Sequence, residues 1–129
     1  RRILVEGDLR AIEDLRVLTL HHPDWGLGPY LLGSIAASRS RFAQAAARFR
    51  QALARKLPSA LFRHEALKRL GKVLFLNEKY RAAQNVFQQL KDQTRARVKQ
   101  LAAADWIARC RWARTFAKPL DQRFQLEKK

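Results

Sequence analysis

The chain has 129 residues, of which 47% are apolar, and this is enough for one domain with a buried core. No stretch approaches the roughly 18 to 20 uninterrupted apolar residues of a membrane span, and the single cysteine, Cys110, excludes an internal disulfide and a cysteine-based metal site. The formal net charge of +16 favours an anionic partner, such as an acidic protein surface, nucleic acid, an anionic glycan or lipid headgroups.

Residues 1–25 combine a helical apolar pattern with a loop. The apolar residues that predict the helix are Leu9, Ile12, Leu15 and Leu18. The pair His21-His22 before Pro23 is the one feature here that suggests a metal site. Zinc needs about four ligands at defined spacing, and no acidic cluster accompanies this pair. We therefore interpret it as a solvent-facing loop and expect no metal.

The middle of the chain contains an internal repeat with a period of 38 residues. Each copy begins with Leu-Gly and continues at matched offsets with Phe42, Ala45, Phe49 and Ala52 after Leu32-Gly33, and with Tyr80, Ala83, Phe87 and Leu90 after Leu70-Gly71. A small residue in one helix lets a second helix approach closely, and the aromatic residues fill the space between them. One such helix pair cannot bury its apolar faces alone, so neighbouring pairs must stack.

Turn-forming residues divide the repeat into helices. Pro29 suits the first turn of a helix, and Pro58-Ser59 opens the next first helix. Ser40 and Asn77 are placed to cap the N-termini of the second helices. Downstream, residues 94–116 predict a long helix that ends at Lys118-Pro119.

The predicted helix over residues 94–116 has two apolar stripes at helical spacing. The first consists of Ala103, Trp106, Ile107, Cys110, Ala113 and Ala117, and the second of Leu101, Ala104, Ala108 and Trp112. We expect both stripes to be covered, one by the partner helix and the other by the previous repeat. Cys110 is then a small buried apolar residue and not a reactive thiol.

The order Leu-Gly, aromatic, Ala, Phe and Ala or Leu at these spacings resembles the tetratricopeptide repeat over residues 30–57 and 67–92. The usual period of this family is about 34 residues, so the longer period implies an extra turn or a longer connection around residues 54–62. The resemblance implies an all-α solenoid of antiparallel helix pairs with about three repeats. Its parts are a degenerate repeat at 1–25, repeats at 26–57 and 58–93, and a long helix with a partial repeat at 94–129.

Basic residues are distributed unevenly along the chain. Between Asp24 and Glu65 there is no acidic residue, although seven Lys and Arg fall in this gap. The predicted helix over residues 41–56 carries a polar, cationic stripe that consists of Arg41, Gln44, Arg48, Gln51 and Arg55. This stripe is either a binding surface or the solvated outer face of its helix.

In tetratricopeptide repeat proteins, the first helices of the repeats line a concave groove that binds a peptide. By resemblance, the partner-binding residues of this chain are Tyr30, Ser34, Lys68, Arg69, Lys72 and Arg109. Clamps for a peptide C-terminus in this family also use Asn, which the matching positions lack. The resemblance therefore implies an acidic partner segment, held by charge-assisted hydrogen bonds.

The sequence has no arrangement typical of an active site. General acid–base catalysis uses paired carboxylates or a carboxylate beside a histidine, whereas the eleven acidic residues of this chain are scattered. We therefore predict a non-catalytic scaffold or adaptor without a cofactor. Its basic groove would bind an acidic segment of another protein, within a larger assembly or export machine.

Two other functions stay open at this stage. Nucleic acid or another anionic polymer fits the net charge and the aromatic residues among basic ones from Arg109 to Phe116, and an anionic membrane surface fits the arginine stripe. Because the chain starts at Arg1 and has no methionine, we expect it to be a piece of a longer protein whose exposed repeat ends self-associate. The abundance of Ala, Arg and Leu hints at a bacterial protein, for which periplasm and cytoplasm are both compatible.

Overall fold

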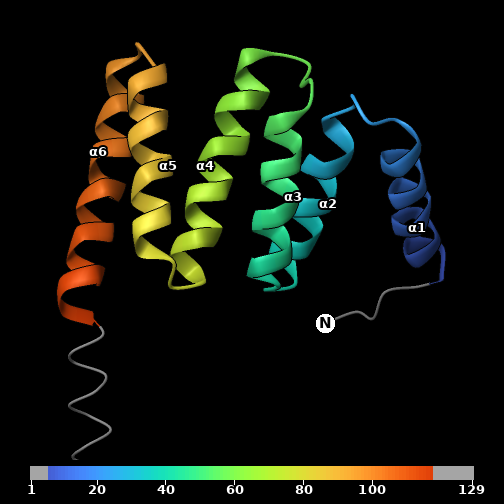
Figure 1. Cartoon of the computed structure of the whole chain (residues 1–129), viewed down its shortest axis with the longest axis horizontal. Coiled ribbons are helices and arrows are strands. Elements are labelled where there is room, and N and C mark those ends of the chain that lie inside the picture. The colour runs from blue at the N-terminus through green and yellow to red at the C-terminus, as the bar shows by residue number, and fades with distance from the viewer. Residues whose placement is uncertain (1–5, 118–129) are drawn as a thin grey trace, which may run out of the picture. The chain divides into compact units, whose positions relative to one another are not determined.

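The structure is a computed structural model that describes residues 6–117 (Figure 1). Within this range the chain forms helices and no β-strand. The helices are α1 (Glu6–His21), α2 (Leu27–Ser38), α3 (Phe42–Ala54), α4 (Ala60–Leu76), α5 (Tyr80–Gln93) and α6 (Arg97–Trp112), followed by a π-helical turn at Ala113–Ala117. The predicted all-α fold is therefore confirmed for the described residues. None of these helices combines the length and the apolar composition needed to cross a bilayer.

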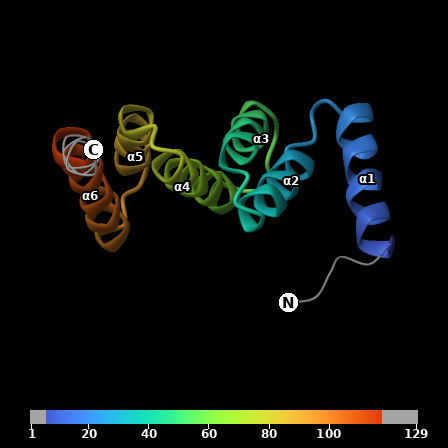
Figure 2. The ribbon, with the colours of Figure 1, turned by 90° about the horizontal axis from the view of Figure 1, so that it is seen from below.

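The chain divides into two units, Arg1–Ala66 and Leu67–Lys129. The first unit contains α1, α2, α3 and the start of α4, and the second contains the rest of α4, α5 and α6. A short turn at residues 39–41 joins α2 to α3, and another at residues 94–96 joins α5 to α6. The helices of each pair therefore run antiparallel and lie side by side (Figure 2).

The core of the first unit forms where α2 meets α3. The Phe49 side chain is fully buried, and a Cβ atom at Gly33 would lie only 3.0 Å from its ring. Glycine at this position thus lets the ring of α3 pack directly on the backbone of α2. The Tyr30 ring packs edge-on against Phe49 and Phe62, with centroid distances of 6.0 and 5.6 Å.

Helix α1 packs on α2 through a buried polar residue. Thr19 is buried, and its hydroxyl donates a hydrogen bond of 2.7 Å to the carbonyl oxygen of Leu15, so the polar group is satisfied. The connection from α1 to α2 is held by Lys56 beyond the end of α3. Its N–H donates to the Asp24 carbonyl at 3.0 Å, and its carbonyl accepts from the Gly26 N–H at 2.8 Å.

The second unit contains the same packing 38 residues further along the chain. Phe87 on α5 is fully buried, and a Cβ atom at Gly71 on α4 would lie 2.6 Å from its ring. The Trp106 ring of α6 stacks on the Phe87 ring at a centroid distance of 5.1 Å and packs edge-on against the Phe75 ring at 5.4 Å. The repeat inferred from the sequence therefore corresponds to a repeated contact between a glycine and a phenylalanine.

The turns before α3 and α5 also repeat, in their backbone conformation. Ser40 and Glu78 have φ angles of 59° and 62°, in the left-handed region. The next N–H, of Arg41 or Lys79, donates at 2.9 Å to a carbonyl five residues earlier, as in a Schellman motif. The predicted caps at Ser40 and Asn77 are thus wrong. Arg41 and Lys79 precede the two helices without a side-chain cap, because the backbone turn closes the preceding helix instead.

The other predicted helix starts are confirmed. The Ser59 hydroxyl accepts a hydrogen bond of 3.3 Å from the Phe62 N–H at the start of α4. Pro29 lies in the first turn of α2, where a missing N–H costs nothing. The predicted helix end at Lys118-Pro119 lies outside the described residues, as do the two ends of the chain.

One of the two predicted apolar stripes of α6 is buried and the other is exposed. Ala103, Ile107, Cys110 and Ala113 of the first stripe are buried. In the second stripe, the exposed fractions are 55% for Leu101 and 54% for Trp112. The expectation that both stripes are covered is therefore wrong at these two residues. Within the second unit, α5 covers only one side of α6.

Candidate functional site

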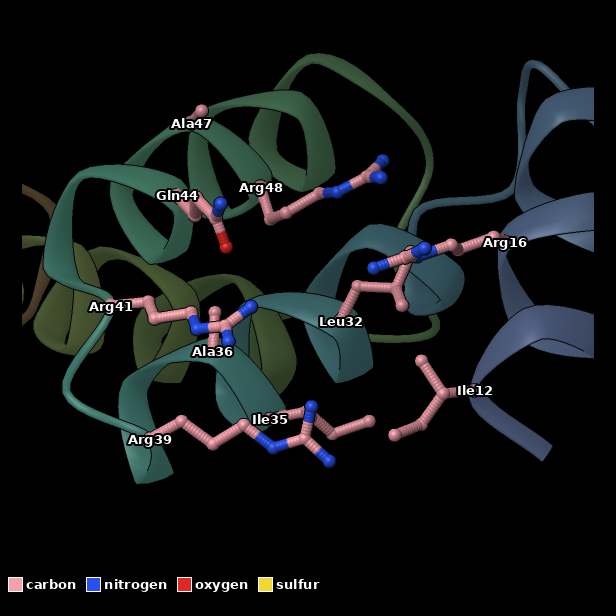
Figure 3. A pocket seen from close by; sticks show the side chains of 10 residues that line it. All are labelled: Ile12, Arg16, Leu32, Ile35, Ala36, Arg39, Arg41, Gln44, Ala47 and Arg48. Atoms are coloured by element: carbon pink, nitrogen blue, oxygen red, sulfur yellow. The ribbon is translucent and has the colours of Figure 1, made fainter. Parts of the chain in front are cut away.

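A pocket of about 280 Å³ lies between α1, α2 and α3 of the first unit (Figure 3). Its lining is basic and apolar, and consists of Ile12, Arg16, Leu32, Ile35, Ala36, Arg39, Arg41, Gln44, Ala47 and Arg48. Four of these side chains are guanidinium groups, and none is a carboxylate. We call this site the arginine pocket.

Helices α1, α2 and α3 all contribute to the arginine pocket. Arg39 and Arg41 flank the left-handed residue Ser40 in the turn between α2 and α3, which projects both side chains toward the site. Arg48 comes from α3, two turns further along, and Arg16 comes from α1. The floor is apolar and is formed by Leu32, Ile35 and Ala36 of α2 with Ile12 of α1.

The positive charges of the pocket are poorly compensated. Burial lowers the pKa of Arg48, and the nearby charges of Arg16 and Arg55 lower it further. Arg48 donates a hydrogen bond of 3.0 Å to the neutral Gln51 side chain, and Arg16 has an exposed ion pair with Glu13 at 3.5 Å.

The remaining two guanidinium groups, of Arg39 and Arg41, have no hydrogen-bond or ion-pair partner among the side chains that the structure describes, those of residues 9–116. An anion would therefore find donors in this pocket that other side chains do not occupy.

The cationic stripe predicted on α3 separates into two parts. Arg41, Gln44 and Arg48 line the arginine pocket. Arg55 instead donates hydrogen bonds to backbone carbonyls, at 3.0 Å to Thr19, 3.3 Å to Trp25 and 3.5 Å to His22. Arg55 thus caps the C-terminus of α1, where a cation also stabilises the helix dipole.

The residues that the family resemblance placed in a groove lie in both units. In the first unit, the Tyr30 ring is buried, and Ser34 donates a hydrogen bond of 3.1 Å to the Tyr30 carbonyl oxygen. Both residues belong to the packing of α2, and neither lines the arginine pocket. Their role in partner binding stays a prediction.

In the second unit, two of the predicted groove residues lie over the Trp106 ring. The Lys72 ammonium is 5.9 Å and the Arg109 guanidinium 4.6 Å from its centroid. Arg109 also forms an exposed ion pair with Asp105 at 2.9 Å. Lys68 and Arg69 lie on α4, half-buried and exposed respectively, and their binding role likewise stays a prediction.

Sequence reasoning missed two of the four arginines of the arginine pocket, Arg16 and Arg39. Arg39 precedes Arg41 by two residues, and its basic side chain next to a predicted turn was an available signal. Arg16 lies on α1, and only the packing of α1 against α2 brings it to the site. A repeat pattern does not contain this information, because α1 has no matched counterpart in the 38-residue repeat.

A second basic surface lies on α6 and the π-helical turn. Trp112 and Phe116 are 54% and 52% exposed, and their ring centroids are 6.2 Å apart. Arg111 and Arg114 lie beside them in the sequence and are exposed. We call this surface the α6 aromatic face.

The described residues contain no group of three or more His, Cys, Asp or Glu side chains that could hold a metal ion. His21 and His22 are exposed, and Cys110 is buried. A scan of protein-family models, a search of curated proteins and a search of solved structures each found no match for this chain. The candidate site therefore depends on its own geometry and charge.

Proposed function

We propose that this chain is a non-catalytic interaction module that binds an acidic segment of another protein in the arginine pocket. The observation that carries the proposal is the convergence of four guanidinium groups on a pocket without a carboxylate in its lining. Guanidinium groups bind carboxylates through paired, charge-assisted hydrogen bonds. A carboxylate of the partner would supply the acceptors that Arg39 and Arg41 lack among the described side chains of residues 9–116.

The apolar floor of the pocket favours a protein partner over nucleic acid. Leu32 and Ala36 are buried at the base of the pocket, and apolar contacts of this kind suit side chains at the centre of a protein interface. Single-stranded nucleic acid binds by stacking its bases on aromatic side chains. No aromatic residue lines the arginine pocket.

We also propose that the module is built from tetratricopeptide-like repeats. Two features that recur after 38 residues support this: a glycine against a buried phenylalanine, and a left-handed residue in the turn between two helices. Residues 1–25 and 94–129 would then be the incomplete outer repeats. The exposed apolar residues of α1 and α6, such as Leu20 and Leu101, fit the expected self-association of repeat ends.

Nucleic-acid binding is a second candidate function, and the α6 aromatic face favours it. Trp112 and Phe116 are exposed among arginines, which is the combination that stacks on bases and neutralises phosphates. The two candidates therefore make opposite predictions about which unit binds. This allows a single set of variants to separate them.

The experiment compares two double variants with a matched control. Arg39→Gln with Arg41→Gln removes two charges from the pocket, Trp112→Ala with Phe116→Ala removes the α6 aromatic face, and Arg50→Gln with Arg81→Gln removes two exposed charges elsewhere. The ligands are a labelled Glu-rich peptide and a random-sequence oligonucleotide, each titrated at low and physiological salt. Light scattering accompanies each titration, because self-association would change the apparent affinity.

We expect the pocket variant to lose roughly tenfold in affinity for the peptide, which corresponds to about 1.4 kcal/mol, while the control changes little. The proposal is wrong if the pocket variant and the control lose peptide affinity equally. It is also wrong if only the oligonucleotide binds at physiological salt and the α6 variant abolishes that binding.

A further inference from the structure

The four arginines of the arginine pocket form two separate pairs. Arg41 lies at the start of α3 and Arg48 lies seven residues later on the same helix. At a rise of about 1.5 Å per residue, their Cα atoms are separated by roughly 10 Å along the helix axis. Figure 3 shows Arg39 and Arg41 toward one side of the pocket, Arg16 and Arg48 toward the other, and Leu32 between them.

The area between the two arginine pairs is apolar. Leu32 is 6% and Ala36 is 9% exposed, and Ile35 and Ile12 are half-buried beside them. A ligand group bound here would cover this floor and exclude water from it. Burying an aliphatic side chain against such a surface is favourable, whereas a phosphate or a carboxylate would lose hydration there without gaining a donor.

We infer that the arginine pocket recognises an aliphatic side chain placed between two acidic side chains of one extended segment. This inference rests on the proposed function and specifies the partner of that same site. The aliphatic side chain lies on Leu32, Ile35 and Ala36, one carboxylate binds Arg39 and Arg41, and the other binds Arg16 and Arg48. In an extended chain, residues i, i+2 and i+4 share one face, and the chain rises about 3.3 Å per residue. Two acidic residues four positions apart, with the aliphatic residue midway, therefore present all three side chains to the pocket. Their Cα atoms are about 13 Å apart, and the long Glu and Arg side chains span the difference from the roughly 10 Å separation of Arg41 and Arg48.

The electrostatics of the pocket agree with two separate carboxylates. Arg16 and Arg48 both line the pocket, and the pKa of Arg48 is lowered by burial and then by repulsion from Arg16 and Arg55. A carboxylate at this end relieves that repulsion, and a second one at the turn occupies the guanidinium groups of Arg39 and Arg41. A single anion at the centre of the apolar floor would contact neither arginine pair directly.

The test uses three labelled peptides that differ only in the recognised residues. The first has two Glu four positions apart with a Leu midway between them in a Gly/Ser background. The second replaces this Leu by Ser, and the third keeps the Leu but places the two Glu next to each other. Because the changes are made in the peptide, the fold of the protein is the same in every measurement.

We expect the Leu→Ser peptide to bind about tenfold more weakly than the first, and the peptide with adjacent Glu to bind severalfold more weakly. High salt should weaken the binding of all three peptides. It should preserve the ratio of the affinities of the Leu and Ser peptides, since apolar contacts are not screened. On the protein, Ile35→Ser should reduce that ratio toward one. Circular dichroism of the Ile35→Ser variant checks that its helices are retained.

The outcomes separate this inference from the proposed function. In one outcome, all three peptides bind equally and all lose affinity when Arg39→Gln and Arg41→Gln are introduced. The pocket then binds acidic segments without distinguishing the apolar residue, so the inference is wrong while the proposed function stands. If these arginine changes affect none of the peptides, both are wrong. Inorganic polyphosphate serves as a competitor that carries charge without an apolar group. If the same polyphosphate concentration displaces the Leu peptide and the Ser peptide, the pocket binds charge alone and the inference is again wrong.

Discussion

The two units of this protein share a core and differ at the surface. Gly33 lies against Phe49 in the first unit and Gly71 against Phe87 in the second, at the same positions of the repeat. In both units the phenylalanine is fully buried, and the turn before its helix contains a left-handed residue. The repeated sequence positions are thus those at which the backbones of two helices meet.

Outside this core, equivalent positions carry different chemistry. Arg39 and Arg48 of the arginine pocket correspond to Asn77 and Val86 in the second unit, so the second unit cannot assemble the same set of guanidinium groups. There, Lys72 and Arg109 lie over the Trp106 ring instead. Packing thus requires the same residue types at the core positions of both units, whereas the cluster of arginines occurs in only one of them.

The largest effect should come from removing either central ring. Phe49→Ala and Phe87→Ala should each lower the free energy of unfolding by about 3 to 5 kcal/mol, because each leaves a large cavity. Chemical denaturation followed by circular dichroism measures the loss. Hydrogen exchange would locate it, and we expect the loss of protection to be greatest in the unit that carries the change. Equal loss in both units would contradict the division of the chain into two.

The two glycines should respond unequally to a methyl group. A Cβ atom at Gly71 would lie 2.6 Å from the Phe87 ring, compared with 3.0 Å between Gly33 and Phe49. We expect Gly71→Ala to cost roughly 1 to 2 kcal/mol after the gain of about 1 kcal/mol in helix propensity, and Gly33→Ala to cost less. Thermal denaturation compares them. A larger cost at Gly33 would show that Phe87 moves aside more easily than Phe49.

Arg55 should contribute stability that the second unit lacks, since its counterpart in the repeat is Gln93. Arg55→Gln loses three hydrogen bonds from a charged donor to backbone carbonyls, for which we expect a loss of about 1 to 2 kcal/mol at this half-buried position. Arg50→Gln, on the exposed side of α3, is the matched control. An equal loss in the control would mean that net charge, and not capping, accounts for the effect.

The smallest effect should be a gain in stability at the two turns. Ser40→Gly and Glu78→Gly relieve the cost of a left-handed backbone at a residue with a Cβ atom, and we expect about 0.5 to 1 kcal/mol from each. Ser40→Ala keeps the backbone strain and should bring no gain. Unfolding midpoints in urea measure these differences. If glycine destabilises either turn, the flexibility that it adds to the unfolded chain outweighs the relief.

The sequence was most informative where one residue has one physical role. The 38-residue period predicted the glycine–phenylalanine contacts because helix packing requires both residue types at a fixed offset. The turns were interpreted incorrectly because Ser and Asn are good N-caps, and Ser40 and Asn77 were therefore assigned as caps. In the structure, Ser40 and Glu78 are instead the left-handed residues that end the preceding helices. Periodicity also identified both apolar stripes of α6 but not which one is covered, so Trp112 was assigned to the core.

The candidate site was predictable only in part. Arg41 and Arg48 follow from helical spacing along α3, and the same spacing grouped them with Arg55, whose contacts are structural. The pocket itself depends on α1, a helix outside the matched repeat. Its arginine, Arg16, reaches the site through tertiary packing, which a pattern of apolar residues does not specify.

Cys110, the one cysteine of the sequence, is fully buried in α6. Burial raises the pKa of its thiol, against the opposing effect of the nearby Arg114 charge. Thiol reagents attack the thiolate, so labelling requires that the contact between α5 and α6 opens first. The rate at which Cys110 is labelled therefore measures how often the second unit opens. The first unit contains no cysteine, so its opening does not contribute to this rate.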